Sequence, residues 1–277
     1  MAARKPPRGD RLGSSLMVKP GSKVDLSKID PAATFGHTKE SAEADLAAGL
    51  TRLESLQDRL WASKAARILI VLQGIDTAGK DGTVRHVMSA FNAQGCQVVG
   101  FGVPTEVEAA HDYLWRHHIA TPAKGWISIF NRSHYENVLV VRVHDLVPKK
   151  VWSKRYDHIN DWERMLVDEG TTILKFFLLI DRDEQRKRLQ SRIDTPEKQW
   201  KFKVDDLKER MLWDQYMAAY EDALSRCSTE SAPWYVIPSN RNWFRNLAVA
   251  EIVADTMDDL KLKYPAPALG IEGTVVE

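Results

Sequence analysis

Five short runs of apolar residues, separated by stretches with helical periodicity, constrain the fold of this chain. Each run is four to eight residues long and nearly continuous, which is typical of strands buried on both faces of a parallel sheet. The runs lie at 68–73, 98–101, 126–130, 173–180 and 234–237. Helices are predicted at 38–64, 80–93, 106–118, 153–169, 183–193, 204–226 and 241–260. This alternation predicts an α/β fold in which helices cover both faces of a five-stranded parallel sheet.

The two ends of the chain differ in composition from the middle. Residues 1–24 hold Gly, Pro, Ser and basic residues with few apolar ones, so we predict a flexible arm there. Residues 265–277 are expected to form a loose tail. Residues 25–264 suffice for a single domain with its own core, and they contain no internal repeat.

Charge and cysteine content exclude several classes of protein. The 277 residues include 39 Lys and Arg against 38 Asp and Glu, a net charge of +1, which argues against a nucleic-acid partner. The two cysteines, Cys96 and Cys227, cannot build a disulfide scaffold or an all-cysteine zinc site. No apolar run reaches the roughly 18 residues of a membrane span, and the N-terminus lacks the apolar core of a secretory signal. We therefore expect a cytoplasmic protein without a membrane partner.

The sequence Gly-Ile-Asp-Thr-Ala-Gly-Lys (74–80) directly follows the first apolar run and precedes a predicted helix. It matches the pattern G-x-x-x-x-G-K of phosphate-binding loops in the strand–loop–helix context that such loops require. The glycines let successive backbone N–H groups point at one phosphate, and the helix start adds its positive dipole end. Lys80 is expected to place a mobile ammonium group against the terminal phosphates. The other predicted phosphate-binding residues are Gly74, Thr77, Ala78, Gly79, Asp81, Gly82 and Thr83.

Two carboxylates depart from the usual loop. Asp81 stands where such loops carry the Ser or Thr that binds magnesium, so Thr83, one turn later, is a candidate for the missing hydroxyl. Asp76 lies inside the loop, where an uncompensated carboxylate would repel a polyanion. We therefore expect Asp76 to hold Mg²⁺ or to take a proton from the attacking group.

A second polar motif, Asn-Arg-Ser-His-Tyr-Glu (131–136), follows the third apolar run. Open α/β sheets bind ligands at the carboxyl ends of their strands, and Arg132 can clamp a phosphate with two hydrogen bonds. A charged segment, 182–210, carries ten Lys and Arg against seven acids and is interrupted at Pro196. It suits either a closing lid or a solvated helix face, and the second is favoured for Arg188.

These motifs together resemble the polyphosphate kinase 2 family. The resemblance is carried by GIDTAGKDGT (74–83), FNRSHYENVL (130–139), RIDTPEKQWKF (192–202) and PWYVIP (233–238), and it runs from about residue 38 to 260. It implies a thymidylate-kinase-like P-loop fold, a three-layer sandwich with a helical lid at about 182–212. It also implies reversible, Mg²⁺-dependent phosphoryl transfer between inorganic polyphosphate and the nucleotides AMP and ADP, by a homodimer or homotetramer.

Residue by residue, the resemblance implies catalytic roles for Asp76, Lys80, Arg132 and Arg192, and polyphosphate contacts for Lys198 and Lys201. Many members of the family carry Asp-Arg-Ser-Trp-Tyr-Asn where this chain reads Asn-Arg-Ser-His-Tyr-Glu. This variant resembles the subgroup that phosphorylates both AMP and ADP, so Asn131 and Glu136 are expected to set nucleotide specificity. With Asn131 in place of the aspartate, Asp76 is left to organise Mg²⁺, and Glu136 is a candidate helper.

Two other functions stay open on the sequence alone. An ordinary nucleoside monophosphate kinase with ATP as donor shares the fold and the loop, but it does not need several lid cations along a groove. A non-catalytic protein that binds polyphosphate or nucleic acid would keep a basic face, but it has no use for Asp76, a carboxylate aimed at the anion. A comparison of phosphate donors separates the first alternative, and Mg²⁺-independent binding without turnover would support the second.

Overall fold

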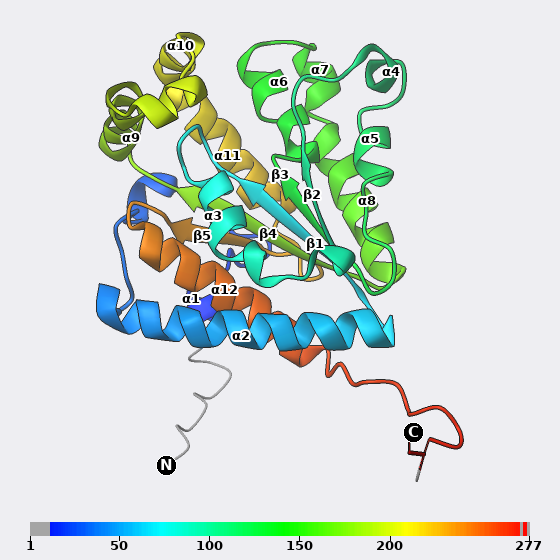
Figure 1. Ribbon diagram of the computed structural model, residues 1–277. Coiled ribbons are helices and arrows are strands. Elements are labelled where there is room, and N and C mark those ends of the chain that lie inside the picture. The colour runs from blue at the N-terminus through cyan, green and yellow to red at the C-terminus, as the bar shows by residue number, and fades with distance from the viewer. Residues whose placement is uncertain (1–11, 272–273, 276–277) are drawn as a thin grey trace.

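A parallel sheet of five strands forms the centre of the molecule (Figure 1). The strands are β1 (Arg67–Gln73), β2 (Cys96–Gly100), β3 (Ile127–Asn131), β4 (Thr171–Leu179) and β5 (Trp234–Pro238), in the spatial order β2-β3-β1-β4-β5. In the central strand β1, Ile70 pairs with Ile129 of β3 and Leu174 of β4. The structure, a computed structural model, describes residues 12–271, 274 and 275. It confirms the predicted five-stranded parallel sheet.

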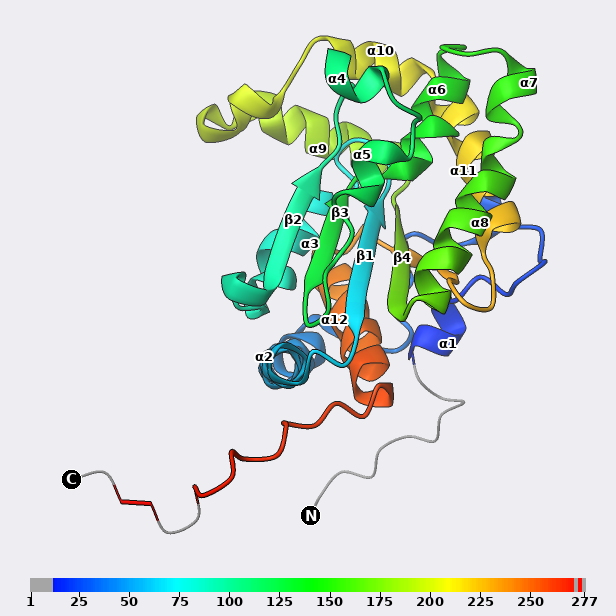
Figure 2. The same ribbon diagram turned by 90° about the vertical axis from the view of Figure 1, so that its right-hand side faces the viewer.

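Helices cover both faces of this sheet, which confirms the three layers. α8 (Arg155–Asp168) and α11 (Trp213–Cys227) lie on one face, and α3 (Lys80–His86) and α12 (Asn242–Asp259) lie on the other (Figures 1 and 2). The central strand is completely enclosed as a result, because Ile68 to Leu72 have no exposed surface. A continuous apolar run is what this burial on both faces requires.

The long helix α2 (Lys39–Ser63) runs across α12 on the outside of one layer (Figure 1). It begins at a capping box, in which the Ser41 amide donates to the Thr38 hydroxyl at 3.2 Å and the Ser41 hydroxyl accepts from the Thr38 amide at 3.1 Å. Its inner face buries Leu53, Leu56 and Leu60, which recur at the predicted helical spacing. Within the described part of the chain, no helix is both long and apolar enough to span a membrane.

The predicted helix at 106–118 is interrupted. It forms two single turns, α4 (Glu106–Ala109) and α5 (Trp115–His118). The Asp112 carboxylate accepts two backbone N–H groups at the start of α5, at 2.9 and 3.1 Å, and so begins a new turn. The predicted helix at 80–93 also ends early, at His86. The other short helices between residues 88 and 152 are η3 (Met88–Ala90), η4 (Ala93–Gly95), η5 (His134–Asn137), α6 (Val140–Val143) and α7 (Lys149–Trp152).

The charged segment of the sequence lies above the carboxyl ends of the strands (Figure 2). It forms α9 (Arg182–Asp194), a 3-10 helix η6 (Pro196–Lys201) and α10 (Asp205–Met211). Pro196 opens η6, a position where a missing backbone N–H costs no hydrogen bond. The single helix predicted at 204–226 is two helices, because the backbone leaves helical geometry at Leu212, between α10 and α11.

The predicted flexible arm is wrong for residues 12–24. α1 (Leu12–Leu16) packs against α12, and η2 (Leu26–Lys28) follows. The Val18 amide donates to the Trp234 carbonyl at 2.8 Å, which ties the segment to the edge strand β5. Its polar average composition conceals the buried apolar residues Leu16, Val18 and Val24. Residues 1–11 of the predicted arm lie outside the described residues, and 265–271 contain no helix or strand.

Candidate active site

The phosphate-binding loop connects β1 to α3 and requires unusual backbone conformations. Gly74 and Gly79 have φ values of 153° and 111°, which L side chains rarely adopt. A Cβ atom on Gly74 would also lie 2.9 Å from the Leu178 carbonyl oxygen, so only glycine fits. Thr77 has a φ of 67°, a strained value for a β-branched residue. Such strain is typical of functional loops that the surrounding structure holds in place.

Lys80 is folded back onto this loop. Its Nζ donates to the carbonyl oxygens of Gly74 and Ile75 at 2.6 and 3.2 Å, and the side chain is buried. Burial, together with the nearby charge of Arg132, lowers the pKa of Lys80 to about 8. The ammonium group that was expected to be mobile is therefore buried and held by the carbonyl groups of its own loop.

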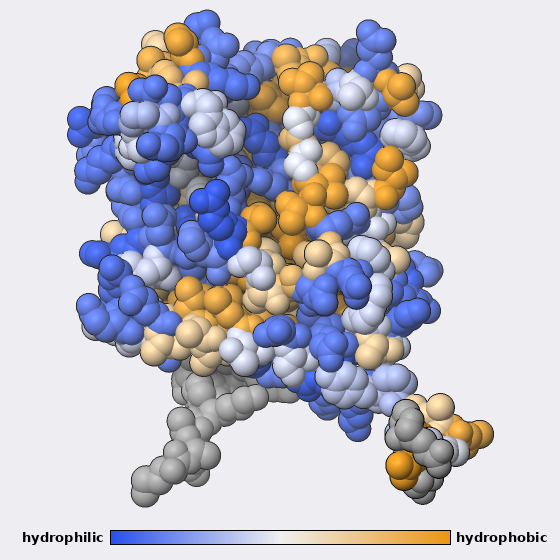
Figure 3. Space-filling model, viewed as in Figure 1, coloured by the Kyte–Doolittle hydropathy of each residue, from blue (hydrophilic) through white to orange (hydrophobic). Residues whose placement is uncertain are grey.

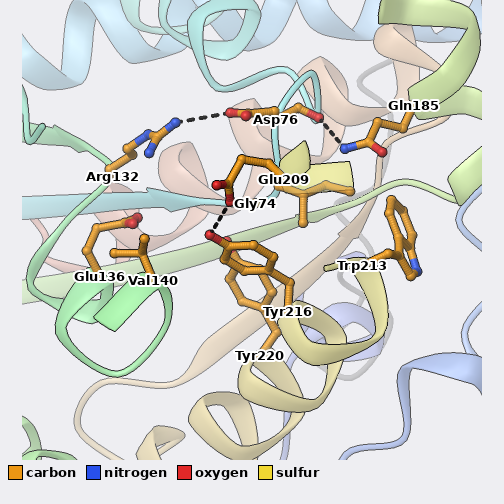
Figure 4. A pocket seen from close by; sticks show the side chains of 11 residues that line it. Gly74, Asp76, Arg132, Glu136, Val140, Gln185, Glu209, Trp213, Tyr216 and Tyr220 are labelled. Atoms are coloured by element: carbon orange, nitrogen blue, oxygen red, sulfur yellow. Dashed lines mark hydrogen bonds and ion pairs between the residues drawn. The ribbon is translucent and has the colours of Figure 1, made fainter. Parts of the chain in front are cut away.

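Asp76 and Arg132 form an ion pair across the end of the sheet (Figure 4). Arg132 Nη2 lies 3.0 Å from Asp76 Oδ1, so the charge of the loop carboxylate is compensated by an arginine, a pairing that was not predicted from the sequence. Burial would lower the Arg132 pKa, but the charges of Glu136 and Asp76 outweigh it and raise the pKa. From the lid side, Gln185 of α9 donates to the Asp76 carbonyl at 3.3 Å. The phosphate-binding loop, the second polar motif and the charged segment thus meet at Asp76.

Two concave spaces share Asp76 and Arg132 in their walls. The larger is a groove of about 970 Å³ between the phosphate-binding loop and the segment α9–η6. Its basic lining residues are Lys80, Arg85, Arg132, Arg188, Arg192, Lys198, Lys201 and Arg245. The smaller is a cavity of about 220 Å³ with aromatic walls from α11 (Figure 4). Its aromatic lining residues are Trp213, Tyr216 and Tyr220.

Most of the predicted site residues line one of these two spaces. The groove holds Thr77, Gly79, Lys80, Asp81, Gly82, Asn131, Arg192, Lys198 and Lys201, and the cavity holds Gly74 and Glu136. Ala78 and Thr83 line neither space, so their contact with phosphate stays a prediction. Ala78 is buried in the turn, where its amide donates to the Ile75 carbonyl at 3.1 Å. The Thr83 hydroxyl is turned into α3 and donates to the Gly79 carbonyl at 3.2 Å.

The two residues predicted to set nucleotide specificity line different spaces. Asn131 faces the groove, where its Nδ2 donates to Asp81 Oδ1 at 2.8 Å. Glu136 faces the cavity, where its Oε1 accepts from Gln73 Nε2 at 3.1 Å. Asn131 therefore contacts the carboxylate of the loop, whereas Glu136 lines the cavity.

Four of the ten Lys and Arg residues of the charged segment line the groove, namely Arg188, Arg192, Lys198 and Lys201. Arg192 Nη1 lies 3.6 Å from Asp206 and 3.4 Å from the Lys201 carbonyl oxygen, so it braces η6 against α10. Lys201 Nζ lies 5.0 Å from the ring centre of the exposed Trp200. Figure 3 shows hydrophilic residues gathered over α9. The segment is a charged wall of the groove rather than part of the core.

Several residues of the site were not predicted from the sequence. Arg188 was expected on a solvated helix face, yet its guanidinium donates to four backbone carbonyls, those of Thr77, Ala78, Ser239 and Asn240, at 2.6 to 3.2 Å. Trp213, Tyr216 and Tyr220 stand three and four residues apart, which indicates one helix face. That spacing was visible, but it does not tell a core face from a cavity face.

A buried polar network attaches the second motif to the core. Lys175 Nζ donates to Glu163 Oε2 at 2.5 Å and to the Tyr135 hydroxyl at 2.9 Å. Glu163 Oε1 accepts from the Tyr135 hydroxyl at 2.9 Å and from His134 Nε2 at 3.1 Å. Burial lowers the His134 pKa, so the ring is neutral and its Nε2 carries the proton. Burial would raise the Glu163 pKa, but the charge of Lys175 outweighs it and lowers the pKa.

Asp76 and Arg132 form the wall that the groove and the cavity share. The oxygen ligands at and beside this shared wall fit the magnesium ion that the resemblance implies. Mg²⁺ is usually held by one or two carboxylates together with substrate phosphates and water. Among the residues that the structure describes, no group of three or more His, Cys, Asp or Glu could hold a metal alone. Asp76 uses only Oδ1 in its pair with Arg132, and the buried Thr77 hydroxyl has no hydrogen-bond partner within the described residues. Asp76, with Glu136 in the same cavity wall, fits such a partial site.

The fold and this site together define a P-loop kinase, with a strained glycine loop, a buried lysine and a cationic groove at the carboxyl edge of a parallel sheet. The chain belongs to the polyphosphate kinase 2 family, whose model matches residues 36–265. This confirms the resemblance that the four sequence motifs indicated.

Comparison with individual proteins gives the same family. The chain is 54% identical over 262 residues to the AMP/ADP-polyphosphate phosphotransferase of Meiothermus ruber, which covers 94% of this chain and 98% of the relative. It is 46% identical over 261 residues to the ADP-polyphosphate phosphotransferase of Rhodopseudomonas palustris. This match covers 88% of this chain and 89% of the relative. The crystal structure of polyphosphate kinase 2 from Arthrobacter aurescens TC1 is similar with a TM-score of 0.91 at 42% identity, covering 95% of this chain and 94% of that one.

Proposed function

We propose that this protein transfers phosphoryl groups reversibly between inorganic polyphosphate and the nucleotides AMP and ADP, with Mg²⁺. The observation that carries the proposal is the meeting of a long cationic groove and a small aromatic cavity at Asp76 and Arg132. A flexible polyanion needs many cations along a groove, whereas a base needs a flat apolar surface on which to stack. The shared wall is where a phosphoryl group can pass between the two.

Each residue of the wall has a distinct role in this proposal. Phosphoryl transfer depends on positioning and on neutralising charge rather than on covalent chemistry. Lys80 and Arg132 hold the transferring group, and Arg192 closes over it from the lid formed by α9, η6 and α10, which excludes water. Asp76 orients the acceptor and holds the metal. Asp76, with Glu136 as a candidate second ligand, would hold Mg²⁺, which would supply positive charge that offsets the charge of the phosphates.

Glu136 supports the assignment of both AMP and ADP as acceptors. It lies in the cavity wall beside Arg132, so its carboxylate faces the region where an acceptor phosphate would end. The Meiothermus ruber relative, described as acting on AMP and ADP, covers nearly the whole chain. We also propose that the protein is cytoplasmic and that it forms a homodimer or homotetramer. Sedimentation velocity would test the oligomeric state.

The experiment is phosphorus NMR of the purified protein with Mg²⁺, long-chain polyphosphate and, in separate tubes, AMP or ADP. New β- and γ-phosphate signals from AMP are expected. If a product forms from ADP but not from AMP, the protein uses polyphosphate as donor and AMP is not a substrate. Transfer that appears only when ATP replaces polyphosphate would instead establish an ordinary nucleoside monophosphate kinase.

We expect kcat/KM for polyphosphate to fall as pH rises above about 8, because the buried Lys80 then loses its proton in the free enzyme. Below that pH the ammonium group is charged and attracts phosphate. Bound polyphosphate stabilises the charged form, so kcat should stay constant to higher pH than kcat/KM. Steady-state kinetics across this range at constant ionic strength provide the check. A kcat/KM that holds its value at pH 9 contradicts the role of Lys80.

The lid lysines should act on the polymer rather than on the chemical step. Replacing Lys198 and Lys201 together by glutamine is expected to raise KM for long-chain polyphosphate about tenfold, with little change in kcat. The effect should shrink at high salt, because exposed charges are screened. Lys208→Gln is a matched control, since Lys208 pairs with Asp205 on α10 and does not line the groove. Equal effects of both changes would argue against a specific groove contact.

A further inference from the structure

Arg245, on the first turn of α12, is a buried cation without a carboxylate partner. Its side chain is 2% exposed. Nη1 donates to Asn242 Oδ1 at 2.8 Å, and Nη2 and Nε donate to Asn246 Oδ1 at 2.9 and 3.2 Å. Within the described residues, its guanidinium forms no ion pair. Burial of a charge is costly unless an opposite charge compensates it, and neutral amide oxygens do so only in part.

The guanidinium lies directly against the glycines of the phosphate-binding loop. A Cβ atom on Gly79 would overlap Nη1 of Arg245, and one on Gly82 would lie 2.8 Å from Nη2. Both glycines thus leave space for the arginine, and Gly79 in addition adopts a positive φ. Arg245 also lines the groove, together with its partners Asn242 and Asn246.

Arg245 differs in this respect from the neighbouring Arg188. Arg188 pairs with Glu184 at 2.7 Å and donates to four backbone carbonyls, so its charge and its donors are used within the protein. Burial, together with the charge of Arg188, lowers the pKa of Arg245 to about 10, so it remains charged at neutral pH. A charged guanidinium group that lines a groove for a polyanion can bind a phosphate with two parallel hydrogen bonds.

We infer that Arg245 is a further phosphate-binding residue of the groove, which holds phosphates of the donor chain against the phosphate-binding loop. The inference rests on the proposed function for the identity of the donor, polyphosphate. It adds a contact from α12 to the contacts that the lid and the phosphate-binding loop make with the donor chain.

The first test measures binding without turnover. Inorganic tripolyphosphate is titrated calorimetrically into the full chain with Mg²⁺ and without nucleotide. Arg245→Gln is expected to weaken binding about 10- to 100-fold, and Arg245→Lys less, since lysine keeps the charge but loses the fork. Arg164→Gln is the matched control, because Arg164 is exposed on α8 and pairs with Asp161. KM for the nucleotide should not change.

The second test moves the guanidinium without removing it. Gly82→Ala puts a methyl group against Nη2, and the flexible end of Arg245 must shift. Alanine also favours α3, so the variant should fold at least as well as the parent. It should weaken tripolyphosphate binding in the parent chain and have no further effect in the Arg245→Gln background. Additive effects of the two changes would contradict a shared mechanism.

The outcomes separate this inference from the proposed function. Arg245-dependent binding of tripolyphosphate by a protein that transfers no phosphoryl group from polyphosphate would overturn only the proposed function. Normal affinity in Arg245→Gln and Arg245→Lys, with a lowered melting temperature, would make Arg245 a structural brace and overturn the inference. Failure of the parent chain to bind tripolyphosphate would overturn it as well. If Arg245→Gln does not fold, the tripolyphosphate affinities of Arg245→Lys and Gly82→Ala test the inference instead.

Discussion

Replacing Asp76 by alanine should lower kcat for phosphoryl transfer about a thousandfold while the protein stays folded. Asp76 is the carboxylate in the wall shared by the groove and the cavity, and its pair with Arg132 holds the guanidinium at the point of transfer. Its removal therefore takes away a metal donor and releases Arg132 together. The fold should persist, because Asp76 is partly exposed and a pair of this kind contributes little to stability.

Asp76→Asn separates these two effects. Asparagine keeps an oxygen that can accept from Arg132 but loses the negative charge that makes a carboxylate a strong ligand for Mg²⁺. If charge is decisive, both variants should be equally inactive, whereas a much more active asparagine variant would assign the effect to the position of Arg132. Asp161→Ala, at an exposed pair on α8, controls for loss of a carboxylate elsewhere. Near-normal turnover by folded Asp76→Ala would remove Asp76 from the mechanism.

The sequence predicted those parts of the fold and site that depend on neighbours along the chain. The strands were readable because burial on both faces demands continuous apolar runs, as in β1 and β4. The loop at 74–80 was readable because its glycines and lysine are adjacent in the sequence. Asp76 and Arg132, however, are 56 residues apart, so their pairing was not visible, although both belonged to recognised motifs.

The sequence could not predict contacts that depend on packing between distant segments. Arg245 reaches the loop from α12, and nothing in its local sequence marks it as buried rather than solvated. Residues 12–24 are held by partners such as the Trp234 carbonyl and the Ser225 hydroxyl, which accepts from the Val24 amide at 2.8 Å. Average composition registers the polar residues of this segment but not the few apolar ones that anchor it.

The network around Lys175 shows the same principle inside the core. Lys175 lies on β4, where every other residue from Ile173 to Leu179 is apolar, and it has no exposed surface. Besides Glu163 and Tyr135, its Nζ donates to the Cys227 carbonyl at 2.6 Å, so all three protons of the ammonium group are used. Through Tyr135 and His134 the network fixes η5, the element that carries Glu136 and follows Arg132.

Lys175→Met should therefore reduce the free energy of unfolding by about 3–5 kcal/mol. Methionine fills a similar volume, but it leaves the Glu163 carboxylate buried without its countercharge. Urea-induced unfolding followed by tryptophan fluorescence provides the measurement. Arg164→Met is the matched control on the exposed pair with Asp161, where a loss of no more than about 1 kcal/mol is expected.

A double variant tests the cause of that loss. Glu163→Gln removes the stranded charge, so Lys175→Met combined with Glu163→Gln should be less destabilised than the sum of the two single changes. The coupling would show that the cost comes from an uncompensated buried carboxylate rather than from poor packing of methionine. Strict additivity, or a loss below about 1 kcal/mol for Lys175→Met, would mean that the network does not anchor η5 to the core.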